Sequence, residues 1–318
     1  MKERLLVIFF LSILVISAHS QQEPQFTQYM FYNMLTNPGV AGNENAICAV
    51  IADRMQWVGF KDADGNKVSP ETFFVTINAP IKILRGGLSA AVMQDKIGFE
   101  KTIAVKVGYA YQRNVGLGKL GIGTQIEFNN RSMDFSKLKP ATEDPMLGQL
   151  TGKESDMLID FSLGLFYRVE GSYYIGLSGL HLLNTKGADL AGDLRMILNR
   201  TLILSGGYDF VFPNNPSFEL LPSVNIQSDL SSTLFDVSAL VKYKDQFWGG
   251  LAYAFRQQNF VSVILGVQYK DFKIGYSYDI NVSNKASSLG GTHEIMLGYC
   301  FKLEMEKGRK SYKNTRFL

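Results

Sequence analysis

The sequence predicts an all-β protein: a transmembrane antiparallel up-and-down β-barrel of about fourteen strands, preceded by an irregular N-terminal lead-in segment. The first observation behind this prediction is a strict two-residue alternation of side-chain type between Phe247 and Lys302. A period of two over about ten residues per segment is typical of strands whose two faces meet different surroundings. The second observation is the composition of those two faces.

One face of these segments carries large apolar side chains, and the other carries Gly, Ser and charged residues. The apolar face includes Leu251, Tyr253, Val263, Leu265, Ile274, Tyr276, Ile295 and Leu297. The polar face includes Ala252, Ser262, Gly266, Gly275, Ser277, Asp279 and Glu294. A soluble sandwich buries its large apolar face, but a polar face of Gly, Ser and buried-type charges suits a barrel lumen, which leaves the apolar face for lipid.

Composition agrees with a single barrel. The 318 residues are 46% hydrophobic, yet the mean hydropathy is +0.00, so apolar residues are plentiful without forming long runs. After the first twenty residues no apolar stretch of 18 residues occurs, which excludes a helical membrane protein. A net charge of +3 is too small to indicate a nucleic-acid partner. No Pro/Ser-rich linker divides the chain.

The first twenty residues predict a secretory signal peptide, with Lys2 and Arg4 before an apolar run and a small-x-small cleavage site at 18–20. A membrane anchor is the alternative, but the apolar run is short for a span. We therefore expect the mature protein to leave the cytoplasm. The expected organisation is signal peptide 1–20, lead-in segment 21–46, barrel 47–302 and basic periplasmic C-terminal tail 303–318.

The barrel strands can be placed one by one from the alternation. They are expected near 47–58, 71–79, 86–95, 101–113, 119–130, 157–169, 172–182, 199–210, 217–229, 232–244, 246–256, 259–269, 272–280 and 292–302. Alternate joints are tight, such as Lys244-Asp245 and Lys270-Asp271, whereas 132–156 and 183–198 are long. Short periplasmic turns and long outer loops are typical of bacterial barrels, so both termini are expected to be periplasmic. Pro222 cannot donate to the ladder and predicts a bulge or a late strand start.

Several stretches resemble a known family. Gln25-Phe26-Thr27-Gln28-Tyr29-Met30, Asn37-Pro38-Gly39-Val40-Ala41-Gly42 and Arg54-Met55-Gln56-Trp57-Val58-Gly59 are similar to the N-terminal signature of the PorP/SprF family. Trp248-Gly249-Gly250, Gly275-Tyr276-Ser277-Tyr278-Asp279 and Gly291-Thr292-His293-Glu294-Ile295 continue the resemblance over nearly the whole mature chain. The family comprises outer-membrane proteins of the type IX secretion and gliding motility machinery of Gram-negative bacteria.

The resemblance implies a non-enzymatic outer-membrane barrel that supports secretion or surface attachment of cargo proteins such as adhesins. The implied partners are outer-membrane lipid, periplasmic and outer-membrane components of the secretion system, and secreted cargo. The candidate site residues, for partner contact or a lumen network, are Arg54, Gln56, Trp57, Asp279 and Glu294. The alternative is that these side chains merely knit the barrel interior. Glu294 is expected to face the lumen beside a cation, with His293 on the opposite face at the membrane interface.

The two rival functions are an enzyme barrel and a channel or transporter. An enzyme would need a base and a nucleophile, but the mature chain has only His181 and His293, and Gly176-Leu177-Ser178-Gly179 does not match a nucleophile elbow. Asp62–Asn66 resembles a calcium loop with wrong Gly spacing. We therefore predict no catalytic, cofactor or metal residues.

A channel or transporter for small or hydrophobic molecules stays open as an alternative, because the expected lumen charges are of both signs. These lumen residues are Lys106, Gln125, Glu127, Asp160, Arg168, Arg256 and Asp279.

The two cysteines and the tail give the last predictions. Cys48 begins the first strand and Cys300 nearly ends the last, on the polar face, so barrel closure would bring them near each other. Whether they form a bond is left open, because strand stagger could separate them and a disulfide needs close Cα atoms. The basic stretch 307–316 either is a disordered terminus or docks an acidic surface of a periplasmic secretion component. In the latter case truncation after Lys302 leaves the barrel folded but abolishes export.

Overall fold

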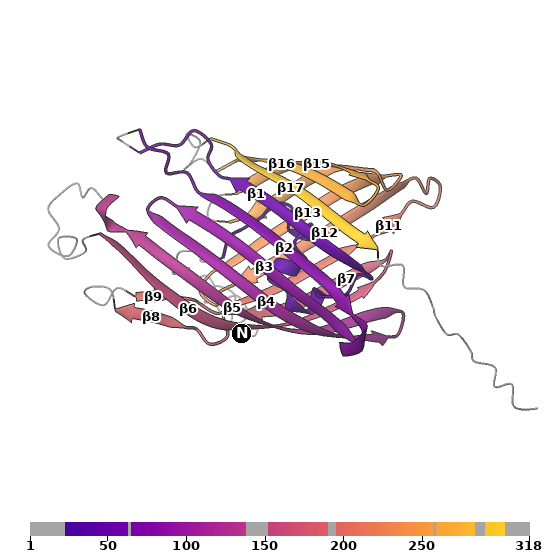
Figure 1. Ribbon diagram of the computed structural model, residues 1–318. Coiled ribbons are helices and arrows are strands. Elements are labelled where there is room, and N and C mark those ends of the chain that lie inside the picture. The colour runs from indigo at the N-terminus through magenta and orange to yellow at the C-terminus, as the bar shows by residue number, and fades with distance from the viewer. Residues whose placement is uncertain are drawn as a thin grey trace, which may run out of the picture.

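The computed structural model describes residues 23–62, 65–137, 152–189, 195–256, 259–283 and 290–302 (Figure 1). The predicted signal peptide and basic tail lie outside the described residues. Within the described ranges, no helix is long and apolar enough to cross a membrane.

The described residues form a closed antiparallel barrel of fourteen strands, in which each strand pairs with its neighbours in sequence and β1 pairs with β17. The strands are β1 (Ala46–Met55), β2 (Glu71–Ile81), β3 (Gly86–Ile97), β4 (Glu100–Val115), β5 (Gly118–Asp134), β6 (Lys153–Val169), β7 (Tyr173–Leu180), β10 (Thr201–Tyr208), β12 (Phe218–Ser228), β13 (Thr233–Tyr243), β14 (Phe247–Phe255), β15 (Phe260–Tyr269), β16 (Phe272–Asn281) and β17 (Thr292–Lys302). The predicted fold class and strand count are confirmed.

Three short strands were not expected. β8 (Lys186–Asp189) and β9 (Arg195–Ile197) lie in the connection from β7 to β10 and form a separate two-stranded sheet (Figure 1). β11 (Phe210–Val211) pairs only with β12. These elements are too short to carry a periodic signal, which explains why the alternation missed them.

The two faces of the strands separate as the alternation predicts. Leu251, Leu265 and Ile274 lie on the outer surface, where 50 to 58% of each residue is exposed. Ser262 and Glu294 face inward and are at most 2% exposed. A continuous outer face of large apolar residues around a polar interior is the arrangement that a lipid bilayer stabilises.

Pro222 lies within β12, and the ladder is built around it. The pairing of β10 with β12 stops at Gly207–Ser223, and β11 takes over at Phe210–Leu220. On its other side Pro222 still has Ala239 of β13 as its register partner. The missing N–H therefore falls at the interruption between β10 and β11, so the strand neither bulges nor starts late.

The two ends of the barrel differ, and we name them by their connections. The turn end carries the tight joints Lys244–Gln246 and Lys270–Asp271, together with η3 (Lys82–Leu84). The loop end carries the connections from β1 to β2, β5 to β6 and β7 to β10, with η4 (Phe135–Lys137) following β5. β1 begins and β17 ends at the turn end.

The lead-in segment does not precede the barrel in space but fills its lumen. Residues 23–45, called the lumen segment below, contain η1 (Tyr29–Phe31), α2 (Asn33–Thr36) and η2 (Pro38–Val40). η2 packs against β4, β5, β6 and β7. The expectation of an irregular, partly helical segment is correct for its local structure, but its position inside the barrel was not foreseen.

The lumen segment runs from near the loop end of the barrel to the turn end. The lumen segment begins at Glu23 beside His181, the first residue beyond the loop end of β7. It then passes Arg54, close to the loop end of β1, and reaches the turn end only where it enters β1. Glu23 therefore lies near the loop end and Lys302 at the turn end, while the expected periplasmic termini themselves lie outside the described residues.

Candidate functional site

The lumen segment is held to the barrel wall first by apolar packing. The rings of Phe26 and Tyr32 form edge-to-face contacts with Phe74 of β2, with centroid distances of 5.0 and 4.9 Å. Phe31 packs against Trp248 of β14 at 5.4 Å. Buried aromatic pairs of this geometry stabilise by about 0.5–1.5 kcal/mol beyond the area that they bury. The segment is thus part of the core of the protein.

Glycines on the inner wall let the backbone of the lumen segment approach closely. A Cβ atom on Gly123 of β5 would lie 2.2 Å from the carbonyl carbon of Pro38, which no side chain tolerates. Gly42 has a φ of +71°, and its Cα-bound hydrogens face Gly87 of β3, where a Cβ would come within 2.6 Å of the neighbouring Cα. Bulkier residues at either place would push the segment away from the wall.

Next, a buried ion cluster joins the segment to the three strands beside the closing seam. The Arg54 guanidinium lies 2.7 Å from an Asp279 oxygen and 2.8 Å from a Glu294 oxygen, and all three side chains are at most 2% exposed. Thr27 completes the cluster, since its hydroxyl donates to Asp279 and its backbone N–H donates to Glu294. Gln28 adds a second backbone N–H to Glu294 at 3.0 Å.

The structure therefore brings together three of the five candidate site residues, and the expected pairing of Glu294 with a cation is present. Gln56 and Trp57 do not join this cluster. They follow β1 at the loop end, where the Gln56 N–H donates to the Pro70 carbonyl and Trp57 adopts a φ of +49°. The Trp57 ring lies 6.3 Å from that of Phe60. A functional role for any of these five residues remains a proposal.

A second buried cluster fixes the beginning of the lumen segment. Glu23 pairs with Nε2 of His181, and the Lys106 ammonium lies 3.2 Å from Glu127 in the neighbouring strand. His181 Nδ1 is 3.9 Å from a Glu127 oxygen. Two carboxylates thus surround two groups that can carry positive charge.

The pKa values of Glu23 and His181 move in opposite directions. Burial by itself raises the pKa of the Glu23 carboxyl, but attraction to Lys106 and His181 outweighs burial and lowers this pKa to about 2. Burial by itself lowers the pKa of His181, whereas attraction to Glu23 and the hydrogen bond with it raise this pKa overall. Both shifts favour the charged pair, which ties Glu23 to the end of β7.

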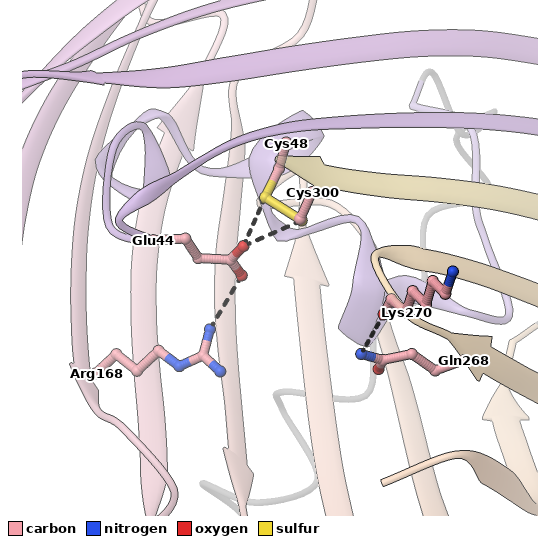
Figure 2. The surroundings of a disulfide bond; sticks show 6 residues. All are labelled: Glu44, Cys48, Arg168, Gln268, Lys270 and Cys300. Carbon is pink, nitrogen blue, oxygen red and sulfur yellow. Dashed lines mark hydrogen bonds and ion pairs between the residues drawn. A yellow bond between two sulfur atoms is a disulfide. The ribbon is translucent and has the colours of Figure 1, made fainter. Parts of the chain in front are cut away.

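At the turn end, a disulfide joins the first and last strands of the barrel. Cys48 and Cys300 are direct register partners in β1 and β17, with a Cα–Cα distance of 4.1 Å, and their sulfurs are bonded (Figure 2). The expectation that closure brings them together is correct. Figure 2 also shows Glu44, at the end of the lumen segment, pointing one carboxylate oxygen at both sulfurs and the other at Arg168.

The Glu44 carboxylate lies beside the two sulfurs of the disulfide, which cannot donate a hydrogen bond to it while they are bonded to each other. Its Oε2 lies 2.8 Å from Cys48 Sγ and 3.5 Å from Cys300 Sγ, but disulfide sulfurs carry no hydrogen to donate. Its Oε1 is 3.4 Å from a nitrogen of Arg168. Among the described residues, Glu44, Cys48 and Cys300 lie close enough together to share a metal ion. Bonded sulfurs, however, are not thiolate ligands.

The same region lines a cavity of about 270 Å³ between the lumen segment and the wall. Its apolar part includes Met30, Phe31, Leu240 and Met296, and its polar rim includes Glu44, Arg168, Lys242, Asp271 and Lys273. Both bonded cysteines belong to the lining. Because Glu44 and Asp271 are exposed, the cavity communicates with solvent at the turn end.

The inward positions expected from the alternation are found inside the barrel. Lys106, Gln125, Glu127, Asp160 and Asp279 are at most 3% exposed. Arg256 pairs with Asp236 at 3.0 Å, while Arg168 lies near the turn end and is more open. The mixed lumen charges are largely used in pairs within the wall or with the lumen segment.

Sequence reasoning missed Glu23 and Glu44, because it placed their segment outside the barrel. The available signal was the Asn37-Pro38-Gly39 turn together with inward glycines in the wall, which indicate that another backbone approaches closely.

Fold and site together define an outer-membrane β-barrel whose lumen holds its own N-terminal segment. The sequence model of the family described as type IX secretion system membrane protein PorP/SprF matches residues 18–299. The chain belongs to this family, and it is an outer-membrane component associated with type IX secretion. No curated protein matches the chain.

Solved β-barrels match the chain at low sequence identity. The Pseudomonas putida toluene transporter TodX is 9% identical, with a TM-score of 0.52 over 85% of this chain and 93% of that chain. A Pseudomonas aeruginosa FadL homologue is 11% identical, with a TM-score of 0.48 over 84% and 92%. The KdgM porin is 11% identical, with a TM-score of 0.39 over 80% and 99%. The likeness to TodX concerns the barrel architecture alone.

Proposed function

We propose that this protein is a non-enzymatic outer-membrane barrel that supports secretion or surface attachment of type IX cargo proteins such as adhesins. Membership of the PorP/SprF family supports the secretion role. The observation that supports a barrel without an open pore is the lumen segment. It crosses the interior and is tied to the wall by the Arg54 cluster and the Glu23–His181 pair. A barrel filled in this way serves better as a platform than as a pore.

The orientation follows from the asymmetry of the two ends. Bacterial barrels keep short turns in the periplasm and long loops outside, so the turn end faces the periplasm and the loop end the cell exterior. The loop end then offers the surface for secreted cargo, and the turn end meets periplasmic components of the secretion system. The basic stretch 307–316, which follows β17, would lie on that side.

The alternative function is a channel or transporter for small or hydrophobic molecules, and the cavity at the turn end is the feature that favours it. Recordings in planar lipid bilayers separate the two functions. The purified full chain should give little steady conductance, whereas reproducible large openings would place the channel first.

A matched pair of variants shows whether the lumen segment is responsible. Arg54→Ala removes the cation that holds Thr27 and both carboxylates, so conductance should rise. Arg256→Ala removes a wall pair with Asp236, and conductance should stay low. Equal behaviour of the two variants would contradict a plugging role.

In cells, deletion of the gene should remove a surface adhesin without changing small-molecule uptake. Complementation with the wild-type chain should restore the adhesin. Loss of uptake with normal adhesin display would support the transporter instead.

A further inference from the structure

The seam disulfide lies where a small reactive molecule can reach it. Cys48 and Cys300 line the cavity of about 270 Å³ that meets solvent at the turn end. The side chain of Glu44, which touches both sulfurs, is 44% exposed. A cavity of this size is near the lower end of the range for small-molecule sites and is too small for a folded domain.

The seam itself does not depend on the bond. The register of β1 with β17 runs without interruption from Ala46–Lys302 to Met55–His293, and β16 pairs with β17 on its other side. Breaking one sulfur–sulfur bond therefore leaves the hydrogen-bonded ladder that closes the barrel. The cysteines can change redox state within the folded protein.

The two sulfurs are not equivalent. Cys48 is only 5% exposed, whereas Cys300 is partly open. Glu44 Oε2 is also closer to Cys48, at 2.8 Å against 3.5 Å for Cys300. The greater exposure of Cys300 therefore directs an approaching thiolate to that sulfur.

We propose that the Cys48–Cys300 disulfide is a thiol-exchange site that accepts a small thiol from the turn end. The thiolate attacks Cys300 Sγ and forms a mixed disulfide, while the bond to Cys48 breaks and its electron pair leaves with Cys48 Sγ. Cys48 then takes up the proton that the small thiol lost, and its S–H donates to Glu44 Oε2. One thiol and one disulfide are consumed, and one thiol and one mixed disulfide are formed.

Glu44 has two effects in this step. As a carboxylate it disfavours negative charge on the departing Cys48 sulfur and so slows exchange, because thiols leave faster when their thiolates are stabilised. Once Cys48 is protonated, Glu44 becomes its hydrogen-bond acceptor. The released thiol thus ties the end of the lumen segment to β1, a link that the bonded state lacks.

The test uses the folded full chain in detergent with glutathione as the probe. After incubation at about pH 8, where a thiol of pKa near 8.5 is partly ionised, free thiols are blocked with iodoacetamide and peptides are analysed by mass spectrometry. The expected product carries glutathione on Cys300 and the blocking group on Cys48, with an unchanged circular dichroism spectrum. Attachment to Cys48, or no attachment until urea unfolds the barrel, would overturn the proposal.

Variants test the part played by Glu44. Glu44→Gln removes a charge beside the leaving sulfur, so exchange should be at least about fivefold faster, the effect of one unit charge at about 4 Å in water. Glu170→Gln, at an exposed position in a neighbouring turn, should leave the rate unchanged. An unchanged or slower rate in Glu44→Gln would refute the role of Glu44, and the labelling of the wild-type chain does not depend on this variant folding.

Discussion

Replacement of Arg54 by Met offers the sharpest test of how the lumen is closed. The substitution keeps an unbranched apolar stem but removes the guanidinium, and it leaves Asp279 and Glu294 without their cation at 2 and 0% exposure. Removing one partner of a buried ion pair typically costs about 3–5 kcal/mol, because the remaining charge stays buried and unpaired. The free energy of unfolding should fall by that amount.

The assay is urea unfolding of the purified chain in detergent, followed by tryptophan fluorescence, with amide hydrogen exchange of residues 25–32 as a local probe. The control is Lys67→Met, which breaks an exposed pair with Glu71 and should cost no more than about 1 kcal/mol. Adding Asp279→Asn and Glu294→Gln to the Arg54 variant removes the stranded charges and should recover part of the loss. A loss below about 1 kcal/mol in Arg54→Met would refute the claim that this cluster holds the segment.

Three further predictions concern other contacts of the lumen segment and seam. Gly123→Leu should displace the segment and raise bilayer conductance, whereas Gly206→Leu, where the nearest atom to a Cβ is 3.6 Å away, should not. The Glu23–His181 pair stabilises the folded protein most between about pH 4.5 and 6.5. Because the pKa of Glu23 is lowered, its contribution to stability is lost only as the pH falls toward 2. Because the pKa of His181 is raised, its contribution is lost as the pH rises above 6.5. Protection factors for amide exchange near Glu23, which remove the intrinsic base catalysis of exchange, should therefore fall above neutral pH, and His181→Asn should abolish that fall. Cys300→Ser opens a loop with a sequence separation of 252 residues and should lower the unfolding free energy by at most about 5 kcal/mol, read from urea midpoints without reductant.

The barrel wall could be predicted from the sequence because each strand reports two environments. Leu251 and Ala252, or Ile295 and Glu294, alternate between lipid and lumen, and this period survives in every long strand. Closure of the first strand on the last predicts that Cys48 and Cys300 come near each other, whereas the register that sets them directly opposite depends on the strand stagger, which the alternation does not fix. The alternation therefore predicts the two faces and the neighbouring first and last strands, and it places Arg54, Asp279 and Glu294 on the lumen face.

The lumen segment could not be predicted in the same way. Its side chains meet wall on several sides, so Phe26, Gln28 and Tyr32 are all buried without any period of two or 3.6. Its position depends on contacts over more than 200 residues, such as Thr27 with Asp279. Its turn residues predict an irregular segment, and such a segment is expected before the barrel rather than inside it.

The ion cluster indicates that the wall and the lumen segment are incomplete without each other. Arg54 supplies one positive charge against the two negative charges of Asp279 and Glu294, so the wall alone leaves a buried excess of negative charge. The backbone N–H groups of Thr27 and Gln28 offset that excess by donating to Glu294. An open pore would have to expose these carboxylates to water and detach Glu23 from His181 as well. We therefore expect opening of the lumen to require displacement of the whole segment, which favours a platform that responds to a partner over a passive diffusion channel.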